Sequence, residues 1–190
     1  SALFRISTLA CVALSIRFTA LFSPMTHDAN ALLWWAGAAL LATKAYGARA
    51  EAAISYTTSP VHTIDYFVRY AQKLEDMGAD QLAIKDMAGL LHPRDAVTLI
   101  RELRAHTTLP LALHSHTTTG VGLLNAVIGM VHGVDSIDSA ITPFAGGSSH
   151  PPVELLIVFA EALGLDHGLN KRLLLKVQAE LFKIFEELKD

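Results

Sequence analysis

Along most of the chain, segments with the apolar pattern of a β-strand alternate with segments whose apolar residues have helical spacing. Four short apolar runs have the composition of buried β-strands and recur at nearly regular intervals. Such an interval accommodates one strand and one crossover helix. The predicted strands cover residues 53–57, 81–85, 109–116 and 136–142.

Segments with apolar residues at helical spacing separate and follow these runs. In the first, Phe67, Ala71 and Leu74 lie on one stripe, and Gly78 suits a C-terminal cap. Pro93 suits the first turn of the second. The predicted helices cover residues 61–78, 92–105, 121–133, 151–164 and 170–190.

Alternating strands and helices predict a parallel sheet, and nearly continuous apolar strands predict that both of its faces are covered. An open doubly wound sheet and half of a (β/α)8 barrel both fit four units. Polar residues at the carboxyl end of every predicted strand favour the barrel, because a barrel collects its chemistry there. We therefore predict an α/β fold of the (β/α)8 TIM-barrel type, of which this chain holds about the last four βα units. These polar residues are Thr57, Thr58, Ser59, Lys85, Asp86, His114, His116 and Thr142.

The remaining regions are an apolar N-terminal segment, residues 1–50, and an amphipathic C-terminal helix, residues 166–190. The apolar runs near the N-terminus are shorter than the ~18 residues of a membrane span. We expect buried or irregular packing there; a membrane or targeting segment and a mistranslated region are the alternatives. Residues 51–165 form the barrel half.

Composition excludes some functions. The net charge is −3 and charged residues make up 17%, which leaves no basic surface for nucleic acid. The single cysteine, Cys11, rules out an intrachain disulfide and fits the reducing cytoplasm.

His114 and His116 are the strongest chemical signal. Two residues apart on a strand, they point to the same face. Two imidazoles at a strand end make half of a divalent metal site. The alternative is two ordinary polar residues at the rim.

Lys85 ends the strand before them. A lysine inside a barrel mouth is costly unless it is paired or modified. It could pair with Asp86 or Asp138. It could also react with carbon dioxide to give a carbamate, an anionic oxygen ligand.

Two loops carry further hydroxyl groups. Residues 143–152 contain glycines whose amides can face an anion, together with Ser148 and Ser149. Residues 56–63 contain Thr57, Thr58 and Ser59. Simple turns into the following helices are the alternative for both loops.

Four motifs, "ISYTTSPVHT", "IKDMAGLL", "LHSHTTTG" and "DSAITPFAGGSSHPP", occur in an order that resembles the carboxyltransferase domain of biotin-dependent enzymes. The family includes pyruvate carboxylase, the oxaloacetate decarboxylase α chain and the transcarboxylase subunit acting on pyruvate. The resemblance implies a (β/α)8 barrel with a divalent metal, zinc, manganese or cobalt, at its mouth. It also implies carboxyl transfer between carboxybiotin and pyruvate or oxaloacetate.

The resemblance also implies roles for individual residues. Lys85 is the carbamylated metal ligand and belongs to the catalytic machinery, and His114 and His116 are the histidine ligands. Ser148 stands where many members have a threonine that carries a proton between biotin and the enolate. The residues expected to bind substrate are Thr57, Asp86, Thr142 and Ser149.

The chain departs from the family pattern at its N-terminal end. A first-strand aspartate motif like "RDAHQS" and the first three βα units are absent, and residues 1–50 resemble a rewritten fourth unit. We expect activity to be incomplete without a partner, which would be the N-terminal barrel half or another copy in a homo-oligomer. No A-M-K-M motif is present, so carboxybiotin comes from a separate carrier domain or subunit, in the cytoplasm or peripheral to a membrane decarboxylase complex.

Two other functions remain open. One is a metal-dependent lyase of the HMG-CoA-lyase type, which shares an H-x-H pair but usually lacks the ligand lysine. The other is a non-catalytic relic or assembly piece, favoured by the missing aspartate.

Overall fold

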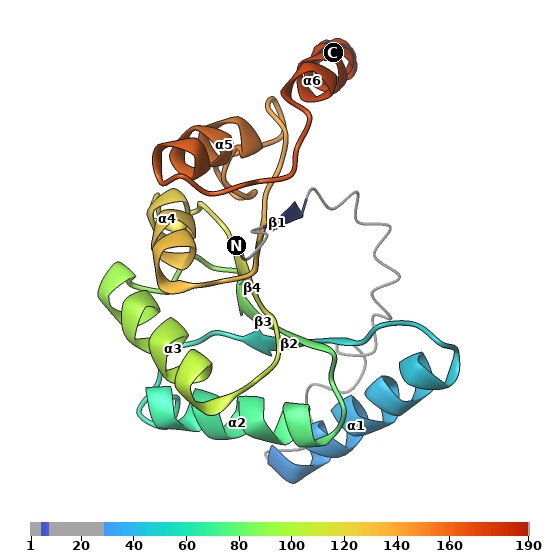
Figure 1. The fold of residues 1–190 in the computed structure, drawn as a ribbon, viewed down its shortest axis with the longest axis vertical. Helices are drawn as coiled ribbons and strands as arrows, with labels where there is room; N and C mark the ends of the chain where they lie inside the picture. Colours follow the sequence, from blue (N-terminus) through green and yellow to red (C-terminus); the bar gives the residue numbers. More distant parts are fainter. Residues whose placement is uncertain (1–4, 8–28, 190) are drawn as a thin grey trace.

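A five-stranded parallel sheet, in the order β1-β5-β4-β3-β2, organises the protein (Figure 1). The structure, a computed structural model, describes residues 5–7 and 29–189. The predictions made for residues 1–4 and 8–28 fall outside the described residues. The strands are β1 (Arg5–Ser7), β2 (Glu51–Ser55), β3 (Gln81–Asp86), β4 (Leu111–Ser115) and β5 (Ser136–Asp138).

Helices follow the strands in the expected alternation. They are α1 (Ala29–Ala45), α2 (Ile64–Asp76), α3 (Pro93–His106), α4 (Gly122–His132), α5 (Val153–Ala162) and α6 (Lys171–Glu187). The Thr63 side chain caps α2 by accepting from the Tyr66 amide. Gly78 and Gly133 follow α2 and α4 with φ of +89° at both, a conformation that glycine adopts without strain.

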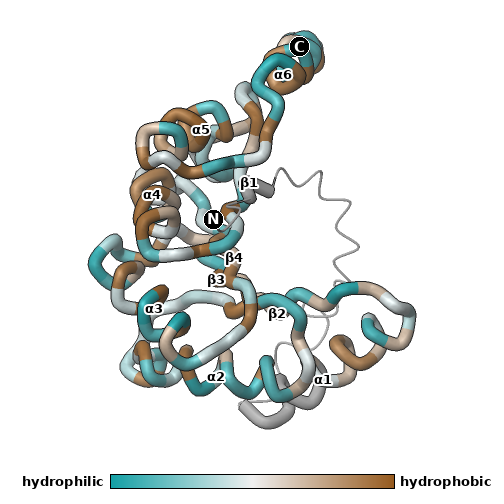
Figure 2. The backbone as a smooth tube through the Cα atoms, in the orientation of Figure 1, coloured by the Kyte–Doolittle hydropathy of each residue, from teal (hydrophilic) through white to brown (hydrophobic). Residues whose placement is uncertain are grey.

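One face of the sheet packs against the helices and makes the core. Leu82, Ile84 and Leu113 point to this face and are at most 1% exposed. Figure 2 shows that α4 and α5 are mostly hydrophobic, whereas α2 is largely hydrophilic away from its buried stripe. The hydrophobic core therefore lies between the sheet and the helices outside it, as it does in the wall of a barrel.

The other face of the sheet looks toward the inside of the incomplete barrel. Along β2, Ala52 and Ile54 are buried, and the alternate residues Glu51, Ala53 and Ser55 are exposed. Figure 1 shows α2 to α5 lining one side of the curved sheet only. The helices of the described part thus cover one face, not both, and the expected half barrel is the observed architecture.

The two ends of the sheet differ. β1 pairs in parallel with β5, with Ser7 opposite Asp138, whereas β2 forms the other edge. In a barrel, the strand of the preceding βα unit would pair with β2. β1 instead pairs with β5, at the opposite edge of the sheet. No helix in the described ranges has the length and apolar character needed to cross a bilayer.

Candidate metal centre

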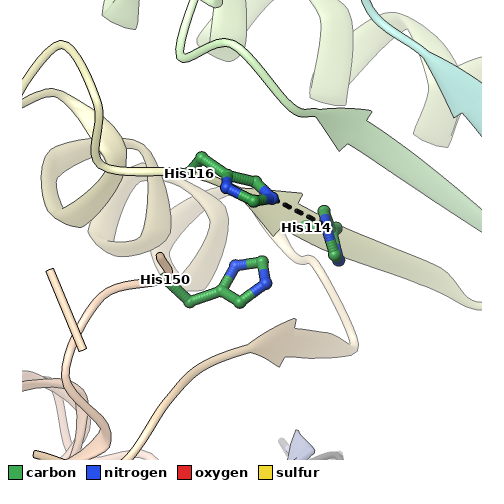
Figure 3. A group of neighbouring side chains, drawn as sticks. All are labelled: His114, His116 and His150. Atoms are coloured by element: carbon green, nitrogen blue, oxygen red, sulfur yellow. Dashed lines mark hydrogen bonds between the residues drawn. The ribbon is translucent and has the colours of Figure 1, made fainter. Parts of the chain in front are cut away.

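Three histidines meet at the carboxyl ends of β4 and β5, on the inner face of the sheet. His114 and His116 come from β4 and the residue that follows it, and His150 comes from the loop before α5 (Figure 3). One ring nitrogen from each lies within 4.8 Å of those of the other two. Lys85 is the register partner of His114 on the neighbouring strand, so its side chain leaves the sheet on the same face.

Each imidazole is oriented by an acceptor at its Nδ1 atom. The His114 Nδ1 atom is 2.7 Å from the Asp138 carboxylate, and the His116 Nδ1 atom is 2.6 Å from the Ser148 carbonyl oxygen. The His150 Nδ1 atom is 3.2 Å from the Ser115 carbonyl oxygen. Because these oxygens only accept, a neutral ring in any of the three positions carries its proton on Nδ1 and keeps its Nε2 lone pair for a metal.

The spacing of the β4 pair fits a metal. The Nε2 atoms of His114 and His116 are 3.3 Å apart. Two imidazoles bound to one tetrahedral zinc ion have their ligand atoms about 3.3 Å apart, since each bond is roughly 2.0–2.1 Å long. The residues present therefore fit a divalent ion at this position.

Burial favours the neutral form of the third imidazole. Burial, followed by the charges of His114 and His116, lowers the pKa of His150 below its ordinary value. Neutral imidazole is the form that binds metals. Sequence reasoning did not single out His150, although it lies in the quoted "GGSSHPP" segment, because nothing local shows that this loop returns to β4.

The loop that carries His150 also carries the two serines predicted for the site. The Thr117 amide donates to the Ser149 carbonyl at 2.8 Å, and the Thr117 hydroxyl donates to the Gly147 carbonyl at 2.8 Å. These bonds bring Ser148 and Ser149 beside His116. Ser148 is exposed, and its carbonyl oxygen contacts His116.

Asp86 lies apart from the histidines. It follows Lys85 on β3 and therefore points to the opposite, helix-covered face, where it is 0% exposed. Its carboxylate accepts from the amides of Leu90 at 2.8 Å and Leu91 at 3.0 Å. This geometry gives Asp86 a structural role in the turn after β3.

The two threonines expected at the site lie in loops that follow different strands. The Thr142 hydroxyl donates to the Glu154 carboxylate at 3.2 Å, which ties it to the start of α5. Thr57 follows β2 and is half-buried.

A largely apolar cavity of about 640 Å³ opens beside the imidazoles. Its polar side includes His114, Asp138, Ser139 and His150, and α6 provides much of the apolar side. The Ser139 hydroxyl is buried without a hydrogen-bond partner among the described residues. A small substrate with one polar end and one apolar end suits such a cavity.

Gly122 allows α4 to begin against the backbone of the site. A Cβ atom added there would lie 2.6 Å from the His116 carbonyl oxygen. We expect Gly122→Ala to lower the free energy of unfolding by about 1–3 kcal/mol, because backbone must move to relieve this overlap. Urea unfolding followed by circular dichroism measures the change.

Gly37→Ala in α1 is the matched control. Its added Cβ would lie 3.6 Å from the Met77 sulfur, an ordinary contact. We expect no loss of stability there, since alanine favours a helix over glycine by up to about 1 kcal/mol. Equal effects of the two substitutions would contradict the close approach at Gly122.

The family model described as HMGL-like matches residues 13–180. The chain belongs to the HMGL-like family. Its similarity to the carboxyltransferase part of biotin-dependent enzymes, expected from the four motifs, is confirmed by the individual relatives.

The HMGL-like chain is 42% identical, over 151 residues, to a pyruvate carboxylase subunit of Methanocaldococcus jannaschii, covering 80% of this chain and 27% of that one. It is 37% identical to the methylmalonyl-CoA carboxyltransferase 5S subunit of Propionibacterium freudenreichii subsp. shermanii, covering 74% of this chain and 28% of that one. The carboxyl transferase domain of Rhizobium etli pyruvate carboxylase with pyruvate and biocytin superposes with a TM-score of 0.71 at 30% identity, covering 75% of this chain and 25% of that one. The chain spans about a quarter of the length of these relatives.

Proposed function

We propose that the protein supplies the C-terminal half of a metal-dependent carboxyltransferase, which moves a carboxyl group between carboxybiotin and pyruvate or oxaloacetate. The observation that carries the proposal is the His114–His116 pair, oriented for a metal beside Lys85. The relatives support it, because they include a pyruvate carboxylase subunit and a carboxyl transferase domain with pyruvate and biocytin.

In this proposal His114, His116 and the carbamate of Lys85 hold a divalent ion at the carboxyl ends of β3 and β4. When bound, the ion supplies a Lewis acid that stabilises negative charge on the enolate oxygen of pyruvate. Asp138 holds the His114 ring in the ligating tautomer. The exposed Ser148 hydroxyl carries the proton between biotin and the enolate, in the position where the family often has threonine.

Substrate contacts in the proposal come from the rim. Thr57, Thr142 and Ser149 have hydroxyls at or near the carboxyl ends of strands, and the cavity beside His114 accommodates the methyl group of pyruvate. Asp86 is left out, because its buried carboxylate already serves two amides. The proposed partners are a biotin carrier domain or subunit and the N-terminal barrel half, in the cytoplasm.

A mixing experiment tests the proposal. The N-terminal barrel half of a pyruvate carboxylase relative is purified separately. The protein is assayed with and without it, in the presence of oxaloacetate, zinc, bicarbonate and free biotin. Pyruvate formed from oxaloacetate is then measured. We expect at least about 10-fold more pyruvate from the mixture than from either part, because the halves together close the site.

Two lysine variants sharpen this test. Lys85→Ala in the mixture should reduce the rate to that of the separate parts. Lys171→Ala, which removes an exposed partner of Glu161, should leave the rate unchanged. A mixture that co-elutes in size-exclusion chromatography, contains zinc and yet forms no more pyruvate than the separate parts would refute the proposed activity.

A further inference from the structure

His150 joins the β4 histidines from a separate segment of the chain. Its ring centroid is 4.3 Å from that of His114 and 4.6 Å from that of His116. Figure 3 shows the three rings around a common space at the end of β4. A ring placed only to fill volume need not bring a nitrogen toward its neighbours, whereas a nitrogen of His150 lies within 4.8 Å of theirs.

The His150 ring also has the orientation of a ligand. Its Nδ1 atom donates to the carbonyl oxygen of Ser115, the residue between the other two histidines. That bond fixes the tautomer and leaves the Nε2 lone pair free for a metal. Three rings thus share one pattern, with Nδ1 bound to an oxygen acceptor and Nε2 available.

Hydrogen bonds fix the backbone of the loop that carries the ring. The Thr117 hydroxyl oxygen lies 2.8 and 3.0 Å from the carbonyl oxygens of Gly147 and Ser149, just before His150 in the chain, and its one proton is donated to either or shared between them. The Gly146 amide donates to the His150 carbonyl at 2.9 Å. A ligand held this way loses little conformational freedom when the ion binds.

We propose that His150 is a third protein ligand, so that His114, His116 and His150 form a three-imidazole site for a borderline divalent ion such as zinc or cobalt. The inference rests on the proposed function for the metal itself and adds this ligand to it. Three nitrogen donors favour zinc and cobalt over magnesium, which prefers oxygen donors. They also allow the chain to bind the ion whether or not Lys85 carries a carbamate.

Calorimetric titration with zinc sulfate tests the ligand set directly. The whole chain is stripped with a chelator and titrated at neutral pH, as the parent, His150→Ala and His132→Ala. We expect His150→Ala to raise the zinc Kd at least about 10-fold, the lower end of what even a supporting residue costs. His132, at the far end of α4, is the matched control and should leave the Kd unchanged.

A second variant keeps the test valid if alanine disturbs the loop. His150→Cys, in a Cys11→Ser background, is loaded with cobalt. A thiolate bound to cobalt gives a near-ultraviolet charge-transfer band, which the Cys11→Ser parent should lack. Only a residue that binds the metal itself produces this band.

The outcomes separate the ligand from the activity. Zinc binding weakened by His150→Ala, with the charge-transfer band present in the cysteine variant, supports the ligand even if the mixture of barrel halves forms no pyruvate. Unchanged zinc affinity in a folded His150→Ala, a cysteine variant without the band, or no zinc binding by the parent overturns it. Pyruvate formation by the mixture would still support the proposed activity in those cases.

Discussion

Replacement of His114 by alanine should weaken zinc binding more than about 100-fold and abolish the proposed carboxyl transfer. His114 provides one Nε2 atom of the 3.3 Å pair and links it to Asp138. Loss of a supporting residue alone costs roughly 10–100-fold in metal affinity, so loss of the ligand should exceed that range. Elemental analysis after gel filtration, with a zinc competition titration, measures the effect.

Asp138→Asn is the graded companion to this variant. The amide oxygen can still accept from the His114 Nδ1 atom, but without the negative charge that raises the basicity of the ring. The zinc affinity of Asp138→Asn should therefore lie between that of the parent and that of His114→Ala. A His114→Ala protein that retains the parent's zinc content would refute the assignment of this site.

Asp86→Ala should lower the free energy of unfolding by about 3 kcal/mol or more. The Asp86 carboxylate is buried and accepts from two backbone amides, and a hydrogen bond to a charged group contributes roughly 1.5–3 kcal/mol. Alanine leaves both amides of the turn without this acceptor. Urea unfolding of the parent and the variant, followed by circular dichroism, measures the difference.

Asp95→Ala is the control for Asp86. Asp95 lies in the first turn of α3, where a carboxylate contributes roughly 0.3–1 kcal/mol through the helix dipole. A stable Asp86→Ala protein with weakened pyruvate binding would restore the substrate-binding role that the structure argues against.

The strands and helices were predictable because their signals are local. Gly78, Gly133 and Pro93 lie at helix ends as the sequence indicated, and apolar periodicity located every helix from α2 to α6. Strand ends were less accurate. The last strand was expected to reach Thr142 but ends at Asp138, because the following residues leave the sheet and only Ala140 forms an isolated bridge, to Pro152.

Predictions for the site also succeeded where the signal is local and failed where it depends on a distant part of the chain. The two-residue spacing of His114 and His116 predicted that both side chains leave the same face of the sheet. In the structure they do, and their Nε2 atoms are 3.3 Å apart. The same alternation places Lys85 and Asp86 on opposite faces, a consequence that was missed because both were grouped as rim residues. His150 could not be found by periodicity, since its approach depends on a loop that crosses back to Ser115.

The acceptors that orient the three imidazoles all lie between Ser115 and Ser148. The ring tautomers are therefore set within one contiguous stretch of the gene. Recombination upstream of β4 could exchange the earlier barrel units and leave this cluster intact. A change of sequence upstream of β4 therefore leaves the residues that orient the three imidazoles unaltered.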